Sequence, residues 1–147
     1  MILRALCAVL AVVGLASCNA SKCSLDDELN QRAGDGAINC GSVGLGDSTS
    51  TVDQCVVKAF DAGTPFLARY AEHGTDSQVA LGVARNRAGT VTFLQWDSDP
   101  SGGSGRNPVI DAWTCNEASV STSASPGPTP KPPVACNSTT TPGRICQ

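Results

Sequence analysis

The segment FLARYAEHGTDSQVALGVARNRAGTVTFLQW, residues 66–96, decides the fold. Within it, residues 78–84 alternate between larger apolar side chains and small ones, and residues 90–96 are rich in β-branched and aromatic residues. Both patterns are typical of β-strands, and the Asn-Arg-Ala-Gly sequence at 86–89 between them is typical of a turn. We therefore expect two neighbouring antiparallel strands here.

The residues on either side extend this pattern. Residues 109–115 also alternate and predict a further strand. Residues 66–73 fit a strand, which we favour, although Thr64 and Pro65 before them would also suit the cap and first turn of a helix. The chain is therefore expected to form three or four antiparallel strands in a meander.

One main amphipathic helix is predicted before the meander, at residues 52–61. Its apolar residues recur at i, i+3, i+4, i+7 and i+8, which places them on one face. Thr51 and Gln54 fit a capping box at the start of this helix, and Gly63 and Pro65 suit its end. Because a helix with one apolar face packs on a sheet, residues 40–115 are expected to form an α+β domain.

The regions flanking this domain are polar. Residues 18–39 form a polar lead, in which Ser24 could cap a short helix that Gly34 would end. Residues 39–50 are rich in Gly and Ser and predict a loop. Residues 116–147 are rich in Pro, Ser and Thr and predict an extended tail that its two cysteines tie back to the domain.

The N-terminus has the pattern of an export signal. Arg4 precedes an apolar run at residues 5–16, which is too short to span a bilayer comfortably. The run leads into Leu15-Ala16-Ser17-Cys18, which resembles the lipobox of bacterial lipoproteins. This resemblance, which covers residues 1–18, implies that the signal 1–17 is removed and that Cys18 receives a diacylglycerol on its thiol and an acyl chain such as palmitate on its amine.

The resemblance further implies a lipid-anchored protein of the bacterial cell envelope, held at the membrane by its N-terminus. Asn19 after the modified cysteine favours the outer membrane, because an Asp there is the usual signal for retention at the inner membrane. Several acyl chains hold a protein that a single chain would hold only marginally. The alternative is ordinary secretion, with cleavage after Ala20.

Six cysteines follow Cys18 in the chain. They are Cys23, Cys40, Cys55, Cys115, Cys136 and Cys146. An even number suits three disulfides in an oxidising compartment, and the sequence alone does not fix their pairing. Cys40 with Cys55 is the pair we favour first, because it closes a short loop, and Cys115 with a tail cysteine is the second. A helix on a small disulfide-stabilised sheet is similar in topology to cystatin-like and β-lactamase-inhibitor-protein-like modules, a similarity that implies no site residues.

Composition excludes several functions. The formal net charge is −3, so the chain has no basic excess with which to bind nucleic acid. A single His and the lack of any C-x-x-C pair argue against a zinc site and a redox dithiol. No Gly-rich phosphate loop is present either, and we expect no cofactor.

An acidic loop at residues 97–107 offers the one candidate metal pattern. Asp97, Asp99 and Ser101 alternate before Gly102, as oxygen ligands do in a calcium loop. Pro108, however, stands where the bidentate Glu should be. We therefore favour a polar connection between strands, and keep a calcium-dependent adhesion module as an alternative.

Two further groups of residues bear on function. His73, Asp76 and Ser77 suggest a small secreted hydrolase, but the sequence has no nucleophile elbow around a serine. Trp96 and Trp113 would form a binding patch if they shared a solvent-facing side of the sheet, together with Asp97 and Asp99; the favoured alternative is that at least one tryptophan lies in the core.

These observations favour a non-enzymatic, lipid-anchored binding or structural module. Its contact surface is expected on the sheet and the loop 97–107, and its partner is expected to be another envelope protein. A small hydrolase that uses polar residues near His73 is the rival hypothesis.

Overall fold

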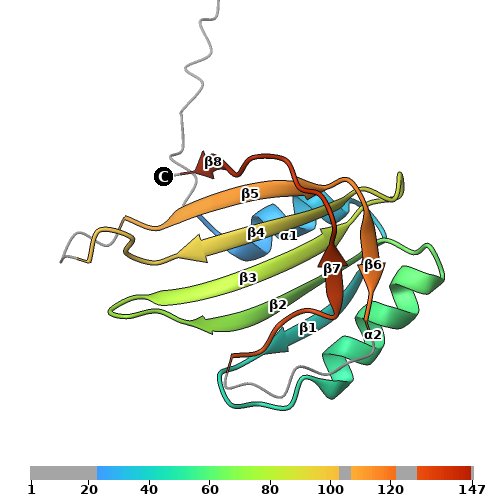
Figure 1. Cartoon of the computed structure of the whole chain (residues 1–147), viewed down its shortest axis with the longest axis horizontal. Helices are drawn as coiled ribbons and strands as arrows, with labels where there is room; N and C mark the ends of the chain where they lie inside the picture. The colour runs from blue at the N-terminus through green and yellow to red at the C-terminus, as the bar shows by residue number, and fades with distance from the viewer. Residues whose placement is uncertain (1–22, 103–106, 122–128, 147) are drawn as a thin grey trace, which may run out of the picture.

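The computed structural model describes residues 23–102, 107–121 and 129–146. The predicted signal 1–17, the lipobox cysteine Cys18 and residues 103–106 of the acidic loop lie outside these ranges. The described chain forms an α+β domain with two helices, a six-stranded sheet and a two-stranded ribbon (Figure 1). The elements are α1 (Leu25–Ala33), β1 (Ile38–Val43), α2 (Ser50–Asp61), β2 (Phe66–His73), β3 (Gln78–Arg85), β4 (Val91–Asp97), β5 (Val109–Cys115), β6 (Ala118–Val120), β7 (Val134–Cys136) and β8 (Gly143–Cys146).

The large sheet has the strand order β1-β2-β3-β4-β5-β8. Strands β2 to β5 form the predicted antiparallel meander, and residues 66–73 are a strand, as favoured. β8 pairs antiparallel with β5 at one edge, and β1 pairs parallel with β2 at the other. The two edge strands lie outside the predicted meander.

The fold class is therefore confirmed, but the prediction of one helix on three or four strands understates the sheet. Residues 39–50 were expected to be a loop, whereas Ile38–Val43 forms β1. β1 contains a bulge between Asn39 and Ser42, where Gly41 has a φ of +96° that favours glycine. β1 forms because β2 supplies its hydrogen-bonding partners. Its own Gly- and Ser-rich sequence lacks the alternation of apolar residues that predicts a strand.

Helix α1 covers one face of the sheet, which we call the α1 face (Figure 1). Ser24 caps it as predicted, its Oγ accepting a hydrogen bond from the backbone N–H of Asp27 at 3.3 Å, and Gly34 ends it. The helix buries its apolar residues, of which Leu29 is fully enclosed, against small and aliphatic side chains of β2 to β5. The packed unit therefore extends beyond the predicted range of 40–115.

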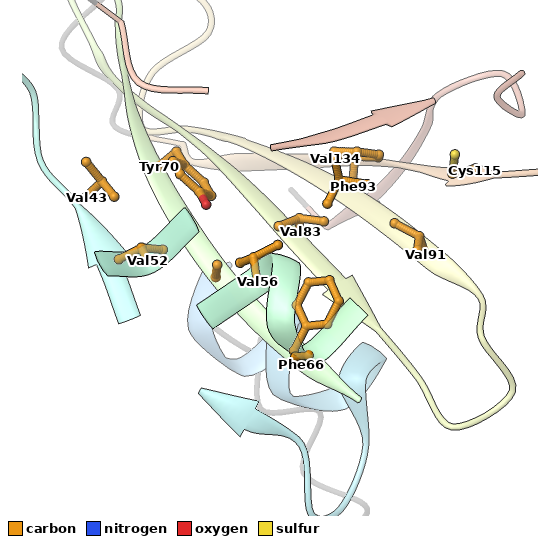
Figure 2. Packing of buried hydrophobic residues seen from close by; sticks show 12 residues of the cluster. Val43, Val52, Val56, Phe66, Tyr70, Val83, Val91, Phe93, Cys115 and Val134 are labelled. Carbon is orange, nitrogen blue, oxygen red and sulfur yellow. The ribbon is translucent and has the colours of Figure 1, made fainter. Parts of the chain in front are cut away.

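Helix α2 covers part of the opposite face, which we call the α2 face, and the ribbon β6–β7 lies over the same face (Figure 1). Figure 2 shows the large side chains that meet in this layer, among them Phe66, Tyr70 and Phe93. α2 begins at Ser50, so Thr51 lies inside the helix and the predicted capping box is wrong. The N-cap is Thr49, whose side chain makes no capping hydrogen bond.

Three disulfides connect the layers. Cys40–Cys55 joins β1 to α2, and Cys115–Cys136 joins β5 to β7, so both favoured predictions are confirmed. The third, Cys23–Cys146, joins the residue before α1 to the end of β8 across 123 positions of sequence. The Pro-, Ser- and Thr-rich tail is therefore tied back, and part of it becomes β6, β7 and β8.

Candidate functional site

Four polar side chains form a cluster on the α2 face of the sheet. Glu72 of β2, Gln95 of β4, Asp111 of β5 and Arg144 of β8 make up this group, which we call the polar patch. In the strand register Gln95 lies opposite Asp111, and Asp111 lies opposite Arg144. All four are at least partly exposed, and the apolar core of the α2 face lies beside them.

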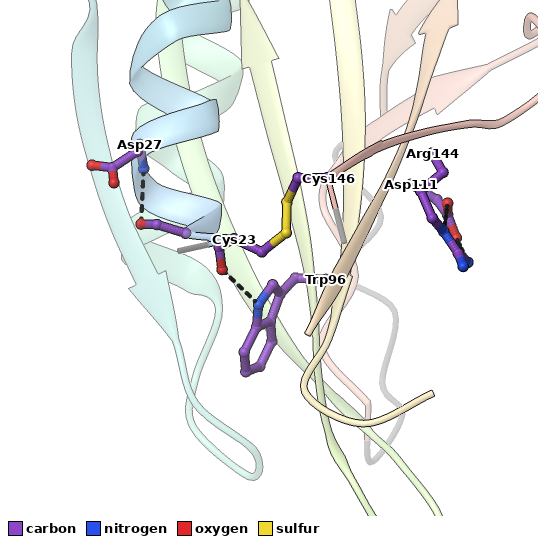
Figure 3. Close-up of a disulfide and its surroundings, with 7 residues drawn as sticks. Cys23, Asp27, Trp96, Asp111, Arg144 and Cys146 are labelled. Carbon is purple, nitrogen blue, oxygen red and sulfur yellow. Dashed lines mark hydrogen bonds and ion pairs between the residues drawn. A yellow bond between two sulfur atoms is a disulfide. The ribbon is translucent and has the colours of Figure 1, made fainter. Parts of the chain in front are cut away.

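Asp111 and Arg144 form a two-point ion pair. The guanidinium donates from Nε to Oδ1 at 3.0 Å and from Nη2 to Oδ2 at 3.1 Å (Figure 3). The hydrogen bonds with Asp111, followed by its charge, raise the pKa of Arg144. A two-point ion pair of this kind fixes the orientation of both side chains. Because both side chains remain partly exposed, their other donor and acceptor sites are accessible to a partner.

Glu72 is the second group of the polar patch whose pKa is raised. Partial burial raises the pKa of its carboxyl, while a hydrogen bond with Gln95 and the positive charge of Lys131 lower it by a smaller amount. The patch therefore combines a partly buried carboxyl group, an amide and an ion pair. These groups can bind a polar partner.

Tyr70 lies two residues before Glu72 on the same face of β2 and is fully buried. Its hydroxyl donates a hydrogen bond of 2.9 Å to Asp53 Oδ1 on α2. Burial, the hydrogen bond with Asp53 and the charge of Asp53 together raise the pKa of Tyr70 far above its usual range. The pair fixes α2 against β2 at the border of the patch.

The residues of the hydrolase hypothesis lie at the turn between β2 and β3. His73 and Asp76 are exposed, and Ser77 is half-buried. Asp76 is directed toward Gly102 in the acidic loop, because a Cβ added at Gly102 would lie 2.6 Å from its Oδ2. A triad needs a buried acid that orients the imidazole, so this exposed turn gives hydrolysis no support.

The acidic loop uses its side chains to hold its own backbone. Asp97 Oδ1 accepts a hydrogen bond from the backbone N–H of Asp99 at 2.9 Å, and Ser101 Oγ donates one to Asp99 Oδ1 at 3.1 Å. In the parts of the chain that the structure describes, no group of three or more His, Cys, Asp or Glu residues is placed to hold a metal ion. These contacts give the calcium hypothesis no support.

The two tryptophans lie on opposite faces of the sheet. Trp96 packs on the α1 face, and its Nε1–H donates to the carbonyl oxygen of Cys23 at 3.2 Å (Figure 3). Trp113 packs on the α2 face and stacks on Phe93, with ring centroids 5.8 Å apart. They do not form one patch; the register places Trp113 and Asp97, but not Trp96, on the face that carries the polar patch.

The members of the polar patch were missed by the sequence reasoning. Alternation within each strand does place Gln95 with Phe93, and Asp111 with Trp113. It does not give the register between strands or the contribution of the tail strand β8. The signal that could have found Asp111 is its charge in an otherwise apolar strand.

Comparisons of the chain with protein-family models, with curated proteins and with solved structures find no match. Within the described ranges, none of the helices has the length and apolar character needed to cross a membrane.

Proposed function

We propose that this protein is a lipid-anchored module of the bacterial cell envelope that binds a protein partner through its polar patch. The observation that carries the anchor is the pairing of the cysteines. All six described cysteines form disulfides with one another, including Cys23, the nearest to the lipobox. In a mature chain beginning at Cys18, that residue is the one cysteine left for a lipid.

The chemistry of thiols supports the same assignment. A free thiol at Cys18 would lie five positions from the Cys23–Cys146 disulfide and would be able to attack it. Conversion of the Cys18 thiol to a thioether with diacylglycerol removes that reaction. The thioether would therefore protect the disulfide framework as well as anchor the chain.

The test of the anchor is the intact mass of the protein extracted from its native membrane, measured before and after reduction. We expect a chain that begins at Cys18, carries acyl chains and gains six hydrogens on reduction. The matched variant Cys18→Ser should keep all three disulfides and lose membrane association. A lipid-free mass that begins after Ala20 would contradict the anchor.

The contact surface is tested separately by site-specific photo-crosslinking in cells. A photoreactive residue in place of Gln95, in the polar patch, should form an adduct with an envelope protein. The matched control is Gln31, an exposed glutamine on α1, which should form none. Asp111→Asn should weaken the Gln95 adduct without changing thermal stability, because an exposed ion pair contributes little to folding. Equal adducts from both positions would exclude the polar patch as the contact surface.

A further inference from the structure

Cys23 is held in the body of the domain by its neighbours on both sides. Its sulfur is bonded to Cys146 of β8, and its carbonyl oxygen accepts the Trp96 hydrogen bond (Figure 3). The next residue, Ser24, caps α1. The position at which the chain enters the domain is therefore fixed.

The length of chain before this point is short. Cys23 follows Cys18 by five positions, and an extended chain spans at most about 3.5 Å per residue, so the two residues lie within about 17 Å of each other. The eight residues of β2, by comparison, extend over about 26 Å. An anchor at Cys18 can therefore bring the Cys23 end of the sheet to the membrane but cannot separate it widely from the surface.

The strand register shows which end of the sheet this is. Cys146 lies opposite Ile110, which lies opposite Trp96, near the end of β4. The turn between β3 and β4, at residues 86–89, is at the other end of β4. Position 90 and Trp96 are six positions apart along this extended segment, which corresponds to about 20 Å.

We infer that the surface around the Cys23–Cys146 disulfide rests on the bilayer that holds the lipid anchor, with the β3–β4 turn directed away from it. This inference rests on the proposed anchor at Cys18. The surface also includes Asp26, Arg69 and Trp96, in which Arg69 pairs with Asp26 at 3.7 Å and lies over the Trp96 ring at 5.9 Å.

The charge of this surface indicates which lipids it meets. The first turn of α1 carries three acidic residues, Asp26, Asp27 and Glu28, and the salt bridge to Arg69 offsets one of them. Anionic headgroups would repel the remainder. The surface therefore fits zwitterionic headgroups such as phosphatidylethanolamine, and it lies on them without insertion because it is polar.

The two tryptophans of the chain allow a direct test by fluorescence quenching. The full mature lipoprotein is bound to phosphatidylethanolamine–phosphatidylcholine vesicles that contain a lipid spin-labelled at its headgroup, which quenches nearby tryptophans. Trp113→Phe leaves Trp96 as the single fluorophore near Cys23. The distant probe carries Ala88→Trp in the exposed β3–β4 turn, with Trp96 and Trp113 both changed to Phe. We expect a larger loss of emission from Trp96 than from the probe at position 88.

The distant probe carries Trp96→Phe, which removes the hydrogen bond to Cys23. A second comparison therefore uses a protein that keeps Trp96. In the Trp113→Phe protein, a Gly/Ser insertion of about ten residues after Asn19 should reduce the quenching of Trp96, because the flexible linker frees the domain from the surface. Vesicle-bound protein with equal quenching at both probes, or with no effect of the insertion, would overturn the orientation. Failure of the protein to bind vesicles, with no acyl mass on Cys18, would instead overturn the proposed anchor.

Discussion

The two faces of the sheet are built in different ways. On the α1 face a single helix packs against small residues, and Gly82 of β3 has no side chain at the place where Leu29 approaches. On the α2 face, larger aromatic side chains fill the space under α2 and the ribbon, and the polar patch lies beside them. The close packing on the α1 face leaves little space for a larger side chain, whereas the α2 face leaves the polar groups of the patch exposed.

Under the proposed function, this difference assigns folding stability mainly to the α1 face and partner binding to the polar patch on the α2 face. Substitutions on the α1 face should act on folding because close packing leaves no space to relax. Substitutions in the polar patch should act on binding with little effect on folding.

Removal of the Cys23–Cys146 disulfide should be the most destabilising change. In the chain-entropy description, a loop of this length contributes about 4–5 kcal/mol, against about 3 kcal/mol for the short loop that Cys40–Cys55 closes. Urea unfolding of the two double Cys→Ala variants gives the comparison. Equal losses would show that the unfolded chain is already compact enough to cancel the difference in loop length.

Gly82→Val should destabilise the α1 face by about 1–3 kcal/mol, the usual cost of overpacking. A Cβ at this position would lie 2.8 Å from Leu29 Cδ2, and Leu29 is fully buried. The matched control is Gly143→Val on edge strand β8, where an added Cβ meets nothing within 4 Å. Thermal melts in which the two variants behave alike would refute close packing at Gly82.

Tyr70→Phe should cost about 1 kcal/mol, because it removes one hydrogen bond to a partly buried carboxylate. The folded state raises the pKa of Tyr70, so the unfolded chain ionises it first. The resulting stability is complete below the ordinary pKa of 10.0 and is lost as pH rises above it. Alkaline unfolding should therefore be steeper in the wild type than in Tyr70→Phe, and Asp53→Asn, which keeps an acceptor, serves as control.

Glu72→Gln should have the smallest effect on folding, visible as a change in pH dependence. Because burial raises the pKa of Glu72 in the folded state, this group favours folding at pH values below its ordinary pKa of 4.5 and loses that contribution as pH rises through the folded pKa. The variant should therefore gain stability relative to the wild type as pH rises from about 4 to about 7. Parallel pH profiles for the two proteins would show that folding does not raise the pKa of Glu72.

The sequence was sufficient to predict the elements whose signals lie within a few neighbouring residues. Ser24 and Gly34 mark the ends of α1, and alternation predicts β3, β4 and β5. The strands β1 and β8 were not predicted, because short segments of six and four residues without apolar alternation become strands only when a neighbouring edge supplies their hydrogen bonds. The predicted capping box at Thr51 was wrong because the helix begins one residue earlier, at Ser50.

The polar patch was harder to predict than the strands, because it depends on how several strands pair. Period-two alternation predicts which residues of one strand share a face, but the polar patch needs the register of β4, β5 and β8 together. Trp96 and Trp113 illustrate the point, since each has a clear place in its own strand and only the register shows that they lie on opposite faces. The favoured cysteine pairs succeeded because loop length and the tail composition limited the choices.

The disulfide between Cys23 and Cys146 closes nearly the whole described chain into a covalent ring. A protease that cuts once at any exposed loop between these residues would open the ring without releasing a fragment, because both pieces stay joined through sulfur. A single proteolytic nick should therefore be invisible by size on a non-reducing gel and appear only after reduction. After a single cut by any protease, such a chain would keep its two halves together, whereas a chain without this disulfide would divide.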